Sequence, residues 1–370
     1  MFRQNAYYPY RAMRDRPYMA EFLKLPDGER RWDTLTQMAL FRTRASFGDR
    51  EQTKGDTMAT ACSMAEATLC DQLASFLTGG HVVFHIAKPL REAFLASDLG
   101  DACGADLKFP FESFYVHLGA DLGFLLNDGK TKLEGVLLDQ HHDGTLRMAL
   151  VGDLAEESPH WGLRGMESFG FFIDKENLHK PLLQAIEDRL THEARDPNEI
   201  KELQDWSKFT VEEKQNIQES WASHDLERQL HLKNLRVTID CRKLVANALL
   251  YLSQYPEDME EGWQEGAPKG YMDKFERQDG KGREKTLSRA RHEGFTLIRR
   301  VGKLFEREEV REQGDSPSPH LRRAHWRRQA FGPKLSMHKL VWIRAVRVLG
   351  GTQRERAYLM ADEEPMASRI

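Results

Sequence analysis

The sequence predicts an α+β protein: an antiparallel β-sheet with helices on one side, followed by a basic β-hairpin near the carboxyl end. The first observation is a set of four neighbouring segments rich in Val, Leu, Phe and Tyr and separated by Gly or Asp, which is typical of strands. The second is Asp143-Gly144 between two of these segments, because Gly tolerates the positive φ of a tight hairpin turn. The expected strands are Ser113–Leu118, Lys132–Asp139, Thr145–Gly152 and Ser168–Asp174.

Hydrophobic residues at helical spacing predict the helices. The firmest helix ends at Gly79-Gly80, a pair that favours a left-handed cap. The first sixty residues lack sustained periodicity, and we interpret them as an irregular arm with one short helix near Arg31–Thr43. The expected helices are Ser63–Leu77, Pro89–Ala96, Leu178–Leu190, Asp240–Gln254 and Glu284–Glu306, with a surface loop over Pro256–Lys281.

The length of 370 residues allows two or three domains and a sizeable hydrophobic core. The longest apolar stretches fall far short of the ~20 residues that span a bilayer, so we expect no membrane partner. The amino terminus lacks the apolar region of a secretory signal, and we expect the protein to stay in the cytoplasm. We divide the chain into an irregular arm (1–60), an α+β sheet region (61–200), a helical region (201–315), a basic β-hairpin module that closes the sheet (316–354) and a tail (355–370).

Charge is distributed unevenly along the chain. The net charge is −4, from 54 basic and 58 acidic residues. Residues 316–354 hold nine Lys or Arg and no Asp or Glu, which leaves 45 basic and 58 acidic residues, or −13, for the rest. This segregation indicates either an anionic partner or docking of the basic segment on the acidic body, and the charge count does not choose between them.

The basic segment contains two apolar and basic runs on either side of Gly332-Pro333. The run Leu340–Leu349 is apolar on both alternating faces apart from Arg344 and Arg347, which predicts an inner strand of a sheet. Its expected partner is Arg323–Phe331, so the two runs form a hairpin with its tip at the Gly-Pro-Lys loop.

The candidate binding residues lie on this hairpin. Arginine supplies planar, bidentate donors suited to phosphate, and tryptophan supplies a stacking face, a combination that binds single-stranded RNA. In the alternative interpretation the arginines pair with carboxylates of the acidic body and the tryptophans fill the core. The candidate ligand-binding or partner-binding residues are His320, Arg322, Arg323, His325, Trp326, Arg327, Arg328, Trp342 and Arg344.

Catalysis is the minority interpretation. His320 and His325 have the chemistry of a general acid–base pair, because imidazole titrates near neutral pH. A hydrolytic metal site normally needs three protein ligands, and the module offers only His338 as a third. The four cysteines are spaced irregularly, and we find neither a Gly-rich phosphate loop nor a nucleophile elbow. We therefore expect no metal and no cofactor.

The run Pro319–Trp326, Pro-His-Leu-Arg-Arg-Ala-His-Trp, is followed by Val341-Trp342 and Val346–Val348. Together they resemble the C-terminal signature of the second type V-A anti-CRISPR family, and Leu107–Val151 is more weakly similar to its central strands. The chain differs from a family member in having Ala324 in place of a glycine and Arg344 in place of a proline.

This resemblance implies an inhibitor, carried by a plasmid or phage, that suppresses production of a type V-A CRISPR effector in a bacterial host. It implies that the partner is the effector's nascent N-terminal peptide or its translation complex, and that recognition leads to loss of the message. The alternative function is an RNA-binding or nuclease-like protein that uses the His, Arg and Trp residues of the hairpin.

Overall fold

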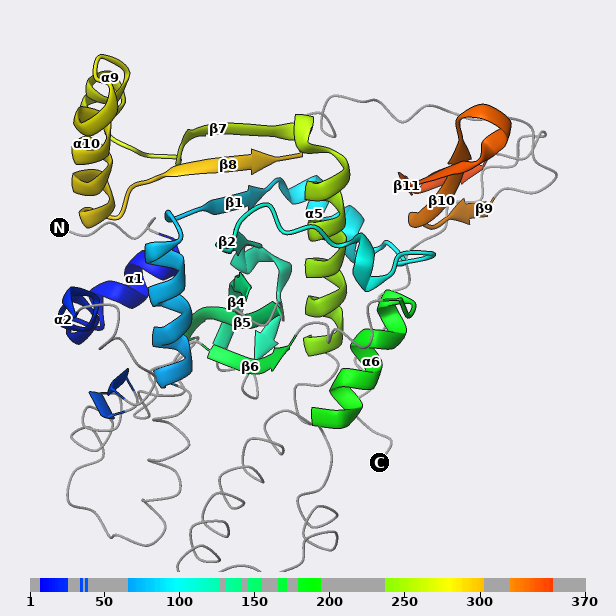
Figure 1. The fold of residues 1–370 in the computed structure, drawn as a ribbon, viewed down its shortest axis with the longest axis horizontal. Coiled ribbons are helices and arrows are strands. Elements are labelled where there is room, and N and C mark those ends of the chain that lie inside the picture. The colour runs from blue at the N-terminus through cyan, green and yellow to red at the C-terminus, as the bar shows by residue number, and fades with distance from the viewer. Residues whose placement is uncertain are drawn as a thin grey trace, which may run out of the picture.

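The computed structural model describes residues 7–25, 34–35, 37–38, 66–126, 131–140, 146–154, 166–171, 179–193, 237–302 and 320–348. These residues form an eight-stranded sheet with helices against it and a separate β-hairpin (Figure 1). The α+β class predicted from the sequence is confirmed. The sheet order is β6-β5-β4-β2-β1-β8-β7, and β3 pairs with β4. The strands are β1 (Val83–Ile86), β2 (Ser113–His117), β3 (Leu125–Leu126), β4 (Thr131–Gln140), β5 (Leu146–Leu154), β6 (Met166–Phe171), β7 (Met259–Trp263) and β8 (Leu297–Val301).

The sheet is mixed, which corrects the prediction of a wholly antiparallel sheet. The β2, β4, β5 and β6 strands form the predicted antiparallel series. The β1 strand, however, pairs in parallel with both β2 and β8. Parallel neighbours need a crossover connection, and α5 (Lys88–Leu95) supplies it between β1 and β2. The central strand has only four residues and its β8 partner lies more than 200 residues away, so no local pattern identifies the pairing.

Both faces of the sheet are covered, although the sequence predicted helices on one side only. Alternate strand residues point to opposite faces, so neighbours such as Phe84 and Val83 belong to different hydrophobic clusters. One face packs against α5, α6 (Leu182–Glu193), the helix over residues 237–254 and the hairpin. The other face packs against the helix over residues 66–78 and the amino-terminal segment.

The amino-terminal segment is helical where the structure describes it, which corrects the prediction of an irregular arm. It forms α1 (Tyr8–Arg14) and α2 (Tyr18–Lys24), and Tyr7, Tyr8 and Tyr10 are buried. A buried ion pair, 2.8 Å between Arg16 Nη2 and Glu66 Oε2, joins the segment to the helix over residues 66–78. Within the short helix expected near Arg31–Thr43, residues 34–35 and 37–38 are helical and the rest lies outside the described residues.

Four of the five predicted helices are confirmed, and the region after residue 255 is different. The expected loop contains β7 and α9 (Lys269–Glu276), and the last expected helix is divided into α10 (Gly280–His292) and β8. Gly294, with φ of +89°, follows α10, and in β8 the side chains of Ile298 and Val301 are buried. The two arginines inside β8 interrupt its apolar pattern, so the sequence did not predict this strand. In the sheet Arg299 and Arg300 are each paired in register with a glutamate of β7.

The carboxyl-terminal hairpin consists of β10 (His325–Phe331) and β11 (Met337–Ile343), joined by Gly332 and a 3₁₀ turn over Pro333–Leu335. The predicted hairpin is thus confirmed. The expectation that the second run is an inner strand is wrong, since among the described residues β11 pairs with β10 alone. The hairpin packs beside α5 and the helix over residues 237–254 instead of joining the large sheet.

Two short strands flank the hairpin, β9 (His320–Arg322) and β12 (Val346–Val348), and they pair with each other. None of the described helices is long and apolar enough to cross a membrane.

Candidate functional site

The hairpin has an inner face against the body of the protein and an outer face. Residues alternate between the two, so the register of Trp326 with Trp342 and of Arg328 with Leu340 puts these four on the inner face. We use the term outer face for the other set. Its members are His325, Arg327, Gln329 and Phe331 of β10 and Met337, Lys339, Val341 and Ile343 of β11.

Trp326 anchors the inner face. Its side chain is 1% exposed, and its indole Nε1 donates a hydrogen bond of 2.7 Å to Oδ1 of Asn247. The amide of Asn247 in turn donates to the backbone oxygens of Phe94 and Lys243 at 3.2 and 3.0 Å. A buried tryptophan usually finds such a partner for its N–H group. The hydrogen bonds tie the hairpin to two helices of the core.

Trp342 is the second anchor. Its Nε1 donates to Oγ of Ser97 at 3.1 Å, and its ring packs edge-on against Phe94 and Tyr251 at 5.5 and 5.7 Å between centroids. Both tryptophans are therefore part of the core, as the alternative interpretation of the sequence proposed. Their rings are not exposed for stacking on a ligand.

A loop after α5 holds the amino-terminal end of β10. The backbone N–H of Asp98 donates to the oxygen of Ala324 at 2.9 Å, and that of Asp101 donates to the oxygen of Trp326 at 3.2 Å. Between them Gly100 has φ of +52°, and a Cβ there would lie 2.1 Å from the Trp326 oxygen. Only glycine fits this close approach between two backbones.

Arg328 pairs with a carboxylate of the body. Its Nη2 lies 2.5 Å from Oδ2 of Asp106 and 3.2 Å from Sγ of Cys103, and its backbone N–H donates to Asp101. Its side chain is on the inner face, which explains why it reaches the body. The basic segment therefore docks on the acidic body through Arg328.

The remaining candidate residues differ in position. Arg323 and Arg327 are exposed and form no ion pair with a described residue. His325 is half-buried, and its Nδ1 lies 3.1 Å from the backbone oxygen of Arg323. Arg344 is half-buried near Tyr251. The side chains of His320 and Arg322 lie outside the described residues, so the acid–base pair stays a prediction.

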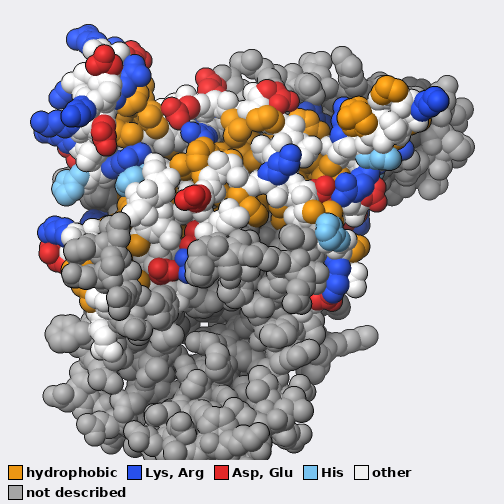
Figure 2. Space-filling view, in the orientation of Figure 1, with side chains coloured by type: hydrophobic (Ala, Val, Ile, Leu, Met, Phe, Trp, Pro, Cys, Tyr) orange, Lys and Arg blue, Asp and Glu red, His pale blue; other side chains and the backbone are white. Residues whose placement is uncertain are grey.

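The outer face and the tip combine basic and apolar side chains (Figure 2). Leu335 at the tip is 63% exposed and Met337 is 52% exposed, the two largest values among the described large hydrophobic residues. Lys334 and Leu335 both have positive φ, at 52° and 57°. Lys339 lies over the ring of Phe331 at 5.8 Å. The surface suits a partner that presents both carboxylates and apolar side chains.

One edge of β11 faces away from β10. In an antiparallel pair the backbone groups of every second residue point outward, and the Trp342 N–H does so, donating to the Tyr255 hydroxyl at 3.2 Å. Leu340 and His338 have the same orientation, and their N–H groups form no hydrogen bond with a described residue. Among the described residues, no strand pairs with this edge over His338 and Leu340.

Sequence patterns did not reveal a polar cluster under α1. His85 of β1 and His117 of β2 are stacked at 5.0 Å, and the Tyr7 hydroxyl lies 3.0 Å from Nδ1 of His85. Burial lowers the pKa of His85 to about 4. Burial alone would raise the pKa of Glu134, but the adjoining His117 and Arg11 lower it. His85 and His117 are separated by a helix in the sequence, so no sequence motif links them. They become neighbours only because β1 pairs in parallel with β2.

The described residues contain no group of three His, Cys, Asp or Glu side chains arranged to hold a metal ion.

The model of the family described as AcrVA2-like, the anti-CRISPR type V subtype A2 family, matches residues 84–350, more than half of the chain. The chain belongs to this family. The resemblance inferred from the run ending at Trp326 is confirmed, and the matched range contains the whole hairpin.

Among solved structures, the one entitled "Crystal structure of AcrVA2" is similar at 11% sequence identity. The alignment covers 92% of this chain and 97% of that one, with a TM-score of 0.41. No curated protein matches.

Proposed function

We propose that this member of the anti-CRISPR family suppresses production of a type V-A effector nuclease by binding the effector's nascent N-terminal peptide. In this proposal it acts in the cytoplasm of a bacterial host and is carried by a plasmid or phage. Membership of the family supports the inhibitory role. The observation that supports peptide binding is the edge of β11 that no described strand pairs with, which lies beside exposed apolar and basic side chains.

An extended peptide adds to such an edge through its main chain. Backbone hydrogen bonds to His338 and Leu340 supply affinity, and every second peptide side chain contacts the hairpin surface. Lys339 and Arg327 favour acidic residues in the peptide, and Met337 favours an apolar one. A nascent chain emerges unfolded, so its backbone groups are free to pair.

The anchoring of the hairpin also favours binding. The hydrogen bonds of Trp326 and Trp342 fix the strand pair before a partner arrives. Less conformational entropy is then lost on association, which improves affinity without additional contacts.

Reporter genes test the proposal. The first codons of the effector are fused to a fluorescent protein and expressed with or without the inhibitor. One version is recoded synonymously, which keeps the peptide and changes the RNA. A second carries compensating frameshifts, which keep nearly all of the RNA and change the peptide. We expect suppression of the recoded reporter and normal expression of the frameshifted one.

The opposite result, suppression of the frameshifted reporter only, would support the alternative of an RNA-binding or nuclease-like protein and overturn peptide recognition. Normal expression of both reporters would exclude recognition of this segment altogether.

Two substitutions test the surface itself. His338→Pro removes an outward N–H and leaves the hydrogen bonds to β10 intact, so we expect loss of suppression, with His338→Ala as its control. Met337→Asp removes an apolar contact, and its control is Leu125→Asp on β3, where the replaced leucine is 43% exposed. Equal effects of variant and control would contradict the assignment of the surface.

A further inference from the structure

The helices α9 and α10 lie at the end of the sheet opposite the hairpin (Figure 1), and side chains of both helices line a groove. The two helices are joined by residues 277–279 and pack against each other. The groove has a volume of about 300 Å³. It is lined by Pro268, Gly270, Tyr271, Lys274, Gln278, Gly282, Lys285, Thr286 and Arg289.

The lining is cationic. It includes Lys274, Lys285 and Arg289 and no Asp or Glu, although acidic residues occur elsewhere on the same helices. Neither lysine forms an ion pair with a described residue. Arg289 lies 4.0 Å from Glu293, measured from its Nε to Oε1, and both of these side chains also hydrogen-bond with the Tyr271 side chain at one end of the groove. Like charges held together on one surface repel one another, and an anionic ligand removes that repulsion.

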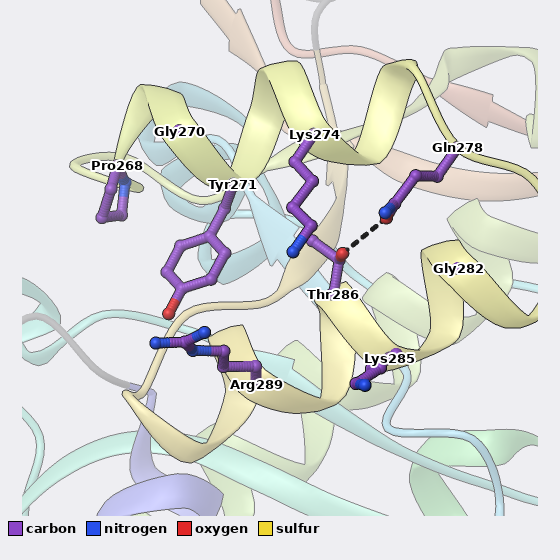
Figure 3. Close-up of a pocket in the computed structure, with 9 residues that line it drawn as sticks. All are labelled: Pro268, Gly270, Tyr271, Lys274, Gln278, Gly282, Lys285, Thr286 and Arg289. Carbon is purple, nitrogen blue, oxygen red and sulfur yellow. Dashed lines mark hydrogen bonds between the residues drawn. The ribbon is translucent and has the colours of Figure 1, made fainter.

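Polar groups in the groove are oriented towards its interior. Figure 3 shows Tyr271 and Lys274 extending from α9 and Arg289 extending back from α10, so that the guanidinium lies near the phenol oxygen. The Thr286 hydroxyl donates to Oε1 of Gln278 at 2.7 Å. This bond holds the Gln278 side chain across the groove and leaves its NH₂ group as a further donor.

An aromatic cluster adjoins the cations. Tyr271 is stacked on Trp263 of β7, with 6.5 Å between ring centroids and 21° between ring planes. Phe275 packs edge-on against Trp263 at 5.6 Å. All three rings are partly exposed, unlike the tryptophans of the hairpin. Figure 2 shows basic side chains beside an apolar patch in this part of the surface.

We propose that the α9–α10 groove binds single-stranded nucleic acid, with Lys274, Lys285 and Arg289 on the phosphates and Tyr271 under a base. Cations that follow a phosphate backbone, together with aromatic faces for the bases, are the chemistry by which proteins hold single strands. The assignment is independent of peptide binding, since it concerns other residues at the opposite end of the sheet.

Fluorescence anisotropy of labelled 12-nucleotide oligo-U and oligo-dT with the full chain tests the groove, and the two oligonucleotides distinguish RNA from DNA as its ligand. For the double variant Lys274→Gln and Lys285→Gln we expect at least a tenfold loss of affinity at about 0.1 M salt. The slope of log K against log salt should fall by about 1.4, because each phosphate contact on a single strand contributes about 0.7.

The matched control is Lys269→Gln with Lys281→Gln, which removes the same charge from the same two helices at exposed positions outside the lining. We expect less than a threefold loss. Tyr271→Ala should weaken binding on the order of tenfold, and Tyr271→Phe should retain it, because a base stacks on either ring.

The proposal is overturned if neither oligonucleotide binds at about 0.05 M salt. It is also overturned if the control pair loses as much affinity as the groove variant. A third contrary result is a tenfold loss of affinity in the hairpin variant Arg327→Gln with Lys339→Gln together with no loss in the groove variant. Because the reporter experiment measures peptide recognition at the hairpin, failure of one proposal leaves the other intact.

Discussion

The indole Nε1 of Trp326 donates a 2.7 Å hydrogen bond to Oδ1 of Asn247, which lies 79 residues earlier in the chain. Both side chains are almost completely buried. Within the helix over residues 237–254, Asn247 is the one polar residue in the otherwise apolar stretch 244–252. The hydrogen bond to Trp326 explains why a polar side chain is buried there. The hairpin is therefore attached to the core by a specific polar contact as well as by apolar packing.

Replacing Asn247 tests this contact. Asn247→Leu leaves the Trp326 N–H buried without an acceptor, and we expect the free energy of unfolding to fall by about 1–3 kcal/mol. Trp326→Phe removes the donor instead. In the double variant neither group is unsatisfied, so the two losses should not add. A double-mutant cycle by urea unfolding measures this, and losses that add within about 0.5 kcal/mol would contradict the contact.

Gly100 is expected to be irreplaceable. Gly100→Ala places a Cβ against the backbone oxygen of Trp326 and also fixes an alanine at positive φ. The matched control is Gly123→Ala, where φ is +73° but no atom lies within 4 Å of the new Cβ. Positive φ alone costs about 1–2 kcal/mol, so the control should lose that much and Gly100→Ala clearly more. Equal melting temperatures for the two variants would show that the loop tolerates the clash.

The buried ion pair between Arg16 and Glu66 should be essential to the amino-terminal layer. Glu66→Gln leaves the Arg16 guanidinium charged and buried, and we expect a loss of about 3–5 kcal/mol in unfolding free energy. The exposed pair of Lys24 with Glu21 provides the control, because Glu21→Gln should change stability by less than about 1 kcal/mol. Denaturant titration of both variants decides whether burial sets the difference.

Acid should loosen the contact of α1 with the sheet. Burial, aided by the nearby Arg291, lowers the pKa of His81 to about 3, and burial lowers that of His85 to about 4. His81 stacks on Tyr10, and Nδ1 of His85 lies 3.0 Å from the Tyr7 hydroxyl. In the unfolded chain both histidines titrate near pH 6.5. Between pH 6.5 and about 4 the unfolded state therefore binds more protons, and the free energy of unfolding decreases as the pH falls.

Hydrogen exchange of α1 and urea unfolding across this pH range measure the effect. His81→Asn removes one titrating group and suits the position, because φ is +60° and Asn tolerates that conformation. We expect the variant to lose stability less steeply on acidification. His292→Asn on the exposed end of α10 is the control and should follow the wild type. An unchanged pH slope in His81→Asn would contradict the burial argument.

The hairpin was predictable because its signals are local. The alternation of apolar and basic residues and the Gly332-Pro333 turn specify two strands and their connection without reference to the rest of the chain. The antiparallel series from β2 to β6 and the helix over residues 237–254 were predictable for the same reason.

The roles of the hairpin residues depended on tertiary structure. Two tryptophans and several arginines in one basic run fit an exposed binding surface as well as a docked one. The tryptophans are buried because Phe94 and Asn247, on distant helices, contact their rings. Arg328 forms an ion pair because Asp106 lies beside it, whereas Arg327 forms none with a described residue.

By itself the sequence determined the α+β class, most of the helices and strands, the hairpin and the family resemblance, since each depends on residue order within one segment. Only the tertiary structure decided the parallel pairing of β1 with β8, the helical layer formed by the first described residues, and the α9–α10 groove. The physical reason is that pairing and burial depend on which remote surfaces remain uncovered, and segments more than 200 residues apart share no local pattern.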